Sequence, residues 1–227
     1  MSFLIIAITF VLLFLPQIWA KKTIRNYNHN REDIPGTGSQ FAHHLLDKLK
    51  ISDCSVRLDS AGIGDHYDPI EKVVSLSEEN YNQNSLSALV IASHEVGHAL
   101  QDRLNYKPLK VRTRLAKFAH LAEKMASIFL FASPLITFLT KMPFVGAIIF
   151  LSAFGVMALP VVIHILTLPV ELDASFNRAL PILSSGYLES EDIIKARKIL
   201  LACSFTYLAA SLAGLLNLWR WIRILRR

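Results

Sequence analysis

The stretch His94-Glu95-Val96-Gly97-His98 places two imidazoles four residues apart, with a carboxylate directly after the first. On an α-helix, residues four apart lie on one face, so His94 and His98 can bind the same metal ion. Zinc suits neutral imidazole ligands, and Glu95 then stands where it can accept a proton from a metal-activated water. The pattern predicts a helix that carries a hydrolytic zinc site with one ion per chain.

The residues around this stretch predict that the helix is buried. Asn84 or Ser85 is a suitable N-cap, and the apolar residues that follow are Leu86, Leu89, Val90, Ile91, Ala92, Leu100 and Leu104. Polar side chains inside such a helix are costly unless a metal or another partner satisfies them. Gly97 costs about 1 kcal/mol relative to alanine in a helix interior. We therefore expect a neighbouring element or a substrate to approach closely there. The alternative interpretation is a pair of hydrogen-bonded core histidines.

Hydrophobic residues make up 52% of the 227 residues, and they gather in long runs. Phe3–Trp19 predicts an uncleaved membrane anchor, because no basic residue precedes it and Ile18-Trp19-Ala20 is a poor cleavage site. Two further runs flank Lys141-Met142-Pro143 and predict a helical hairpin with a tight turn. A fourth run, Leu200–Leu218, is followed by aromatic and basic residues that are typical of an interfacial anchor.

The runs predict an all-α, mainly helical, multi-pass membrane protein with a zincin-like helix in a small membrane-associated catalytic region. The predicted segments are an N-terminal anchor (1–19), a catalytic region (20–125), a transmembrane hairpin (126–170), a second catalytic segment (171–198), a transmembrane helix (199–219) and a basic tail (220–227). Asp59–Leu76 could add a short strand pair, since zinc peptidases often align substrate as an added strand beside the metal helix.

A third zinc ligand is needed, because catalytic zinc usually has three protein ligands and one open position. A hairpin returns the chain to the face it left, so Glu171 would lie on the same side as His94. The other candidates in the sequence are Asp173, His66, His120 and His164. Glu171 is the favoured ligand. The alternative is that Glu171 and Asp173 only mark where the chain leaves the lipid.

Several segments together resemble a known family. They are Asp65–Pro69, Ser75–Glu78, His94–Gln101, Tyr106–Leu109 and Thr167–Ser175. These segments are similar to those of the neutral zinc membrane metallopeptidases, the YugP-like family, and the resemblance extends from about Gly36 to Ser211. It implies a multi-pass membrane zinc peptidase with His94 and His98 as ligands, Glu95 as the catalytic acid/base and Glu171 as the third ligand.

A more distant likeness is to the HtpX-like and CAAX prenyl endopeptidases, which have an aspartate four residues after the ligand glutamate. Here Ser175 occupies that position, and Asp173 lies only two residues after Glu171. Two residues correspond to about 200° on an α-helix, so Asp173 would face away from Glu171. The role of Asp173 as a supporting carboxylate is therefore left open.

His66 and Tyr67 are candidates for the donor that stabilises the oxyanion during peptide hydrolysis. They lie in the turn-like sequence Gly64-Asp65-His66-Tyr67-Asp68-Pro69. The alternative is an Asp/Pro turn with a solvated histidine. His164, inside the third apolar run, is more simply explained as a neutral side chain bonded within the helix bundle than as a functional group.

The net charge of +6 does not indicate nucleic acid, because the basic residues cluster beside the apolar runs. Five of them precede the hairpin and predict an interfacial helix beside anionic lipid: Lys107, Lys110, Arg112, Arg114 and Lys117. The two polar regions hold 19 of the 24 Lys and Arg residues, which favours a cytoplasmic catalytic side. Cys54 and Cys203 imply no disulfide framework.

Together these features predict a membrane-embedded zinc endopeptidase of the cell membrane, with a peptide or a membrane protein as substrate. The alternative function is a non-enzymatic membrane scaffold or ion-handling protein with a structural metal at the histidine pair. Glu95 separates the two, because a structural site has no use for an unliganded carboxylate beside an open metal position. The sequence indicates neither the cleavage specificity nor the oligomeric state.

Overall fold

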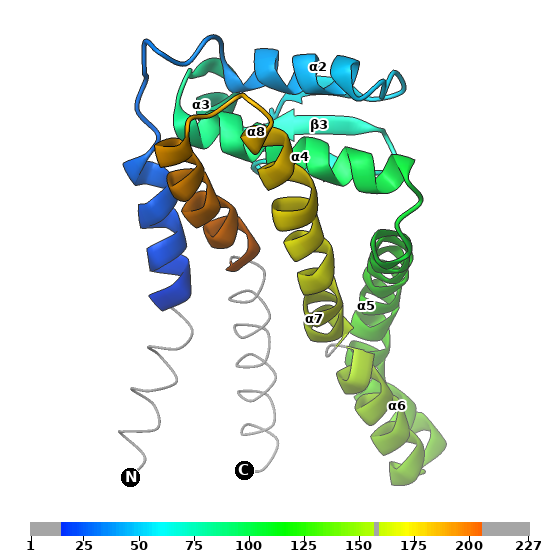
Figure 1. Cartoon of the computed structure of the whole chain (residues 1–227). Helices are drawn as coiled ribbons and strands as arrows, with labels where there is room; N and C mark the ends of the chain where they lie inside the picture. Colours follow the sequence, from blue (N-terminus) through cyan, green and yellow to red (C-terminus); the bar gives the residue numbers. More distant parts are fainter. Residues whose placement is uncertain (1–14, 157–158, 206–227) are drawn as a thin grey trace.

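The computed structural model describes residues 15–156 and 159–205 (Figure 1). Helix α2 (Gly38–Lys48), a small sheet and helix α4 (Leu86–Arg103) form a layered body at one end of the molecule. The other long helices extend from this body towards the opposite end. The buried apolar core lies where α2, the sheet and α4 pack together. This core holds the helix that carries the His-Glu pattern.

Helix α2 begins with a capping box, in which the Thr37 hydroxyl accepts from the Gln40 N–H and the Gln40 side chain accepts from the Thr37 N–H. Its buried face, which includes Phe41 and Leu45, packs against α4. Gly38 lies at the point of closest approach to the rest of the core. A Cβ there would lie 2.1 Å from the carbonyl oxygen of Asn80, so only glycine fits.

The sheet has three strands in the order β1 (Ser55–Leu58), β3 (Val73–Leu76), β2 (His66–Asp68). Strand β1 pairs with β3 in parallel, and β2 pairs with β3 in antiparallel register. Every residue of the central strand β3 is buried. The β2–β3 pair lies within the stretch from which a strand pair was expected, whereas β1 was not foreseen. The fold is therefore mostly helical with a small sheet, and the all-α prediction is wrong.

Helix α4 begins at Ser85, whose side chain accepts from the Ala88 N–H, as the N-cap prediction allowed. A short helix, α3 (Glu78–Asn82), precedes it. Almost the whole of α4 is buried, because α2 and the sheet cover it and the segment after α7 packs along it. Ser87 also donates to the carbonyl oxygen of Ile24, which ties α4 to the helix over residues 15–26.

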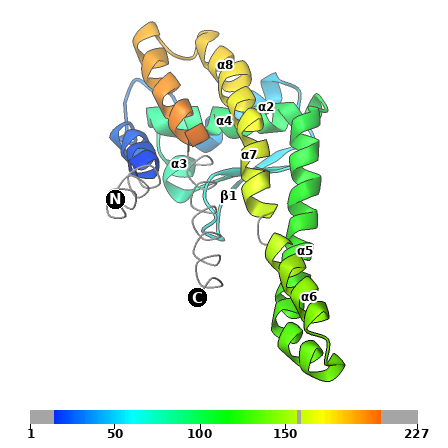
Figure 2. The same cartoon turned by 90° about the horizontal axis from the view of Figure 1, so that it is seen from below.

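The second half of the chain is built from long helices. Helix α5 (Lys107–Thr140) turns at Lys141, which has a positive φ of 53°, into α6 (Pro143–Val156). Figures 1 and 2 both show α6 beside the later part of α5. Helix α7 (Leu159–Leu172) then leads back to the layered body. It continues into the π-helix η1 (Asp173–Ala179) and α8 (Leu180–Ser184), and residues 190–205 form a further helix.

The multi-pass prediction is wrong for the part of the chain that the structure describes. Within residues 15–156 and 159–205, no single helix is both long and apolar enough to cross a membrane. One bent pair within α5, Lys107–Ala126 and Phe131–Thr140, has the required length and composition only when its two parts are taken together across a 49° bend. The bend lies between Ala126 and Phe131, at the start of the apolar run predicted as the first arm of the hairpin.

Several predicted segments lie partly or wholly outside the described residues. These are the first part of the anchor (1–14), the end of the last predicted transmembrane helix (206–219) and the basic tail (220–227). The predicted boundaries of those segments stay predictions. The side chain of His164 is also outside the description, so its suggested role is untested.

Candidate metal centre

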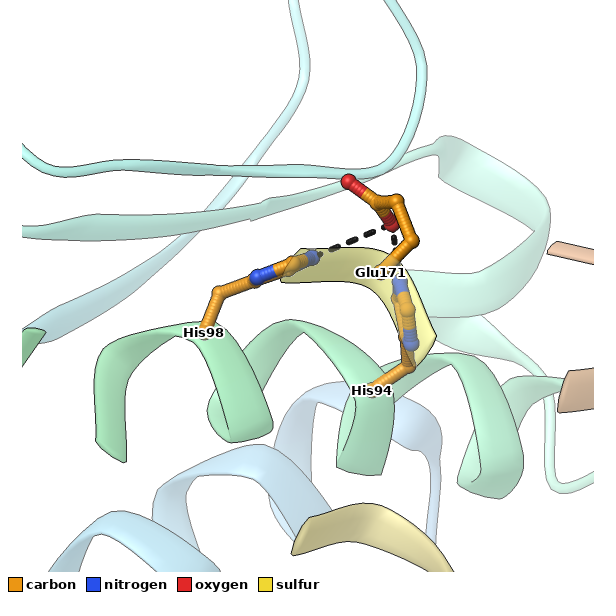
Figure 3. A group of neighbouring side chains, drawn as sticks. All are labelled: His94, His98 and Glu171. Carbon is orange, nitrogen blue, oxygen red and sulfur yellow. Dashed lines mark hydrogen bonds and ion pairs between the residues drawn. The ribbon is translucent and has the colours of Figure 1, made fainter. Parts of the chain in front are cut away.

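His94, His98 and Glu171 come together at one point inside the layered body (Figure 3). One ligand atom from each side chain lies within 4.8 Å of the others. The Glu171 Oε2 atom is 3.1 Å from His94 Nε2 and 3.4 Å from His98 Nε2. All three side chains are buried. These atoms form a metal site of two imidazoles and a carboxylate, the donor set that zinc prefers in hydrolytic sites.

Local structure explains how the three side chains meet. One turn of α4 presents both imidazoles, and the last turn of α7 delivers Glu171. Gly97 lies between the two histidines and faces η1, where a Cβ would come within 2.9 Å of the Ala174 carbonyl oxygen. The expected close approach at Gly97 is therefore confirmed. The neighbouring element is the continuation of the helix that carries Glu171.

Gln101 determines which ring nitrogen of His98 carries a proton. Its amide nitrogen donates to the Val170 carbonyl and to Asp173 Oδ2, both at 2.8 Å. Neither a carbonyl nor a carboxylate can donate, so the amide orientation is set and Gln101 Oε1 must be the acceptor. His98 Nδ1, 2.9 Å from that oxygen, therefore carries the proton. In the neutral imidazole that binds a metal, the lone pair of His98 then lies on Nε2, which faces Glu171.

Ser175 supports His94 in the same way. Its hydroxyl lies 3.0 Å from His94 Nδ1 and 3.1 Å from the hydroxyl of Ser204. Ser175 also lies within hydrogen-bond distance of the Leu200 carbonyl, at 3.4 Å. The outer nitrogen of each imidazole thus has a partner that orients the ring. Such partners are the usual support of metal-binding histidines.

Asp173 is near the metal group but does not belong to it. Its carboxylate accepts from Gln101, from Asn177 at 2.9 Å and from Arg178 at 3.1 Å. Burial raises the pKa of Asp173, but these hydrogen bonds and the charge of Arg178 outweigh burial and lower it. Asp173 therefore acts on His98 through Gln101. Of the other candidate ligands, His120 is exposed on α5.

The environment of Glu171 fits a cation. The side chain is fully buried, and its Oε1 atom has no hydrogen-bond partner among the described residues. Burial raises the pKa of Glu171, but the nearby His98 and the hydrogen bonds to both imidazoles outweigh it and lower the pKa. A buried ionised carboxylate with an unused oxygen is costly in a protein interior. A metal ion held with the two Nε2 atoms would satisfy it.

Glu95 lies on the same turn of α4 and is 6% exposed. Burial is the largest influence on this carboxyl and raises its pKa to about 8, against the opposing effect of His94. Glu171 also raises the pKa of Glu95, whereas Arg112 lowers it. Without a cation, Glu95 therefore holds a proton at neutral pH. A carboxyl that changes protonation near neutral pH is suited to proton transfer.

The two candidate oxyanion donors lie next to each other on β2 but make different contacts. The Tyr67 hydroxyl donates to Asp102 on α4 at 2.8 Å, and burial, followed by this hydrogen bond, raises the pKa of Tyr67. His66 Nδ1 lies 2.8 Å from the Gly64 carbonyl oxygen, so this nitrogen is the donor. Neither residue belongs to the metal group.

Sequence reasoning did not identify Gln101 or assign a contact to Ser175. The spacing of both residues in the sequence could have indicated their positions. Gln101 lies three residues after His98 and Ser175 four residues after Glu171, so each lies near its neighbour's face of a helix. Their partners, however, depend on how η1 packs against α4.

Comparisons with known proteins agree with this site. The sequence profile of a family described as "Putative neutral zinc metallopeptidase" matches residues 2–226. A relative from Bacillus subtilis (strain 168), "Putative membrane protease YugP", is 33% identical over 213 residues, which cover 94% of this chain and 91% of the relative. No solved structure matches the chain. The resemblance inferred from the sequence segments is confirmed.

Proposed function

The chain belongs to the family described as "Putative neutral zinc metallopeptidase", and we propose that it is a zinc-dependent endopeptidase. The observation that carries the proposal is the convergence of His94, His98 and Glu171, with Glu95 on the same helical turn. Three protein donors with a neighbouring free carboxyl are the arrangement of a catalytic zinc site rather than a closed structural one.

In this proposal His94 Nε2, His98 Nε2 and the Glu171 carboxylate hold one zinc ion. Zinc, when bound, supplies Lewis-acid chemistry that polarises water and a peptide carbonyl. Gln101 and Ser175 keep the two imidazoles oriented, so the ligand nitrogens are arranged before the metal arrives. The Glu171 oxygen that lacks a partner among the described residues adds a further donor atom.

Glu95 is the proposed acid/base. A carboxylate accepts the proton of the attacking water and can pass it to the nitrogen of the leaving amine. A cation beside Glu95 would lower its pKa from the raised value of about 8, which favours the ionised form needed in the first step. The burial of Glu95 then limits the exchange of this proton with bulk water.

The oxyanion donor is proposed to be His66 rather than Tyr67. The Tyr67 hydroxyl is already committed to Asp102, whereas His66 uses Nδ1 for the Gly64 carbonyl and directs Nε2 elsewhere. Because Nδ1 already donates to the Gly64 carbonyl, Nε2 can donate to the developing negative charge only when the imidazole is doubly protonated.

We further propose that the protein acts at a membrane. The relative is named a membrane protease, and the α5–α6 pair exposes large apolar side chains, with Phe131 85% and Phe138 79% exposed. Such an apolar surface marks an interaction site with protein or lipid. The basic first half of α5 favours the anionic cytoplasmic leaflet. Substrates would then be peptides or membrane proteins close to this surface.

The test is peptide hydrolysis by purified protein and by Glu95→Gln, with zinc content measured in parallel. Glutamine has nearly the same shape but cannot accept the proton, so turnover should fall by about 100-fold or more while zinc stays near one ion per chain. Glu32→Gln, at an exposed position, is the matched control and should behave like the wild type. If Glu95→Gln keeps more than a tenth of the turnover, Glu95 is not the base. Bound zinc with no hydrolysis by the wild type would favour a structural metal.

A further inference from the structure

A groove of about 250 Å³ lies between the edge strand β2 and the first half of α5. We call it the β2–α5 groove. On one side it is lined by the strand and the following turn, and on the other by one face of the helix. The helix residues are Arg112, Thr113, Ala116 and Lys117. Their spacing places them on the same face of α5.

The β2–α5 groove is positively charged. Arg112 and Lys117 supply two cations on the helix side. The one carboxylate among the lining residues is Asp68, which accepts from the backbone N–H groups of Ile70 at 2.7 Å and Glu71 at 3.1 Å. Asp68 therefore holds the turn after β2. A carboxylate entering the groove would meet more positive than negative charge.

The groove also lies beside the candidate metal centre. Tyr67, which lines the groove, is hydrogen-bonded to Asp102, one turn beyond His98 on α4. Arg112 is close enough to act electrostatically on Glu95. A molecule in the groove would thus lie beside α4, the helix that carries the two histidines and the proposed base.

Strand β2, whose residues line this groove, is an edge strand of the sheet. It pairs only with β3 in the described residues, so its other edge has unpaired backbone groups. Extended peptides bind such edges through backbone hydrogen bonds. Neighbouring pockets then determine which peptide side chains are accepted. A lipid headgroup offers no backbone for this edge. A peptide uses the strand edge and the cations together.

We propose that the β2–α5 groove selects substrates with an acidic side chain near the scissile bond, and that Arg112 and Lys117 are the specificity-determining residues. Arg112 and Lys117 each place a positive charge at the groove, and these charges attract a carboxylate. The inference rests on the proposed peptidase function and adds a substrate class to it.

The experiment begins with digestion of a degenerate peptide library by the zinc-loaded wild-type protein. Fluorogenic peptides that differ only in Glu, Gln or Lys at the selected position are then compared by kcat/KM. We expect the wild type to prefer Glu over Gln by about tenfold, the usual value of one charge-assisted hydrogen bond. Arg112→Gln should remove this preference, and Arg112→Glu should favour the Lys peptide.

Arg114→Gln is the matched control, because Arg114 lies two residues away on α5 and lines a neighbouring groove but not this one. It should keep the wild-type preference. If it changes the preference as much as Arg112→Gln, the overall charge of α5 is responsible and the groove is not the cause. Lys117→Gln gives an independent second variant, and zinc content verifies that each variant is folded.

Binding separates this inference from the proposed function. The labelled Glu and Lys peptides are titrated against zinc-loaded Glu95→Gln protein by fluorescence anisotropy. No hydrolysis by the wild type, together with selective binding of the Glu peptide, contradicts the peptidase proposal alone. Hydrolysis or binding without any acidic preference contradicts the groove inference alone. An Arg112→Gln protein with unchanged peptide preference but weaker binding to phosphatidylglycerol vesicles would assign the groove to lipid headgroups and overturn the inference.

Discussion

Glu171 and Asp173 are two carboxylates close in sequence with different surroundings. Glu171 touches both imidazoles, whereas Asp173 reaches His98 only through Gln101. We predict that Glu171→Ala lowers zinc affinity by at least about 10- to 100-fold, the range found when even an outer partner of a metal ligand is lost. Asp173→Ala should lower it less. Competition titration with a zinc chelator measures both. The reverse order would mean that Asp173 is the ligand.

The sequence predicted the residues of the site that follow from local geometry. His94, Glu95 and His98 share one helical turn, and any helix over these residues brings the two imidazoles together. Glu171 required an argument from topology, namely that the chain returns to the same side. The contacts of Gln101 and Ser175 could not be predicted. They form only after η1 packs against α4, at the place where Gly97 has no side chain.

At the scale of elements, the packing of η1 on α4 depends on the absence of a side chain at Gly97. In Gly97→Ala the new Cβ would lie 2.9 Å from the Ala174 carbonyl oxygen, so the helices must move apart. We predict a loss of about 1–3 kcal/mol in the free energy of unfolding, as for other overpacked cores, together with weaker zinc binding.

Gly155→Ala provides the comparison for Gly97→Ala. Gly155 is also in a helix, but a Cβ there meets nothing within 4 Å among the described residues. It should therefore leave stability unchanged or raise it by up to about 1 kcal/mol through helix propensity. Chemical denaturation with and without zinc measures both variants. Equal effects of the two substitutions would show that close packing at Gly97 has no special importance.

The elements that were predicted incorrectly share a cause. Hydropathy identified the apolar runs, and Lys141-Met142-Pro143 predicted the turn between α5 and α6, but neither predicted the 49° bend within α5. The sheet was only partly foreseen. Strand β1 pairs with β3 across a gap in the sequence. Its alternation of polar and apolar residues, Ser55-Val56-Arg57-Leu58, covers only four positions, which is too short to identify a strand by itself.

At the scale of the whole molecule, stability should depend on pH when the metal is removed. In the folded protein the pKa of Glu95 is raised from 4.5 to about 8, chiefly by burial. Between these values the folded state keeps a proton that the unfolded chain has released, so the free energy of unfolding falls as pH rises. Glu171 acts oppositely. Its lowered pKa gives a stabilisation that is present above pH 4.5 and is lost as pH falls further.

The measurement is urea denaturation of the metal-free protein at several pH values. We predict that Glu95→Gln removes part of the decline in stability between about pH 5 and pH 8, because glutamine does not titrate. Glu32→Gln serves again as the exposed control. A wild-type protein whose stability rises throughout this interval, with Glu95→Gln following the same curve, would contradict the raised pKa of Glu95.

The metal group joins parts of the chain that are made at different times. Glu171 follows His98 by 73 residues, and the α5–α6 pair lies between them. At a synthesis rate of about 5–20 residues per second, the carboxylate leaves the ribosome's catalytic centre roughly 4 to 15 s after the second histidine. A nascent chain therefore carries an incomplete ligand set throughout that interval. Tight binding of zinc becomes possible only after Glu171 has been synthesised. The metal centre therefore forms later than the helix α4 that supplies its two histidines.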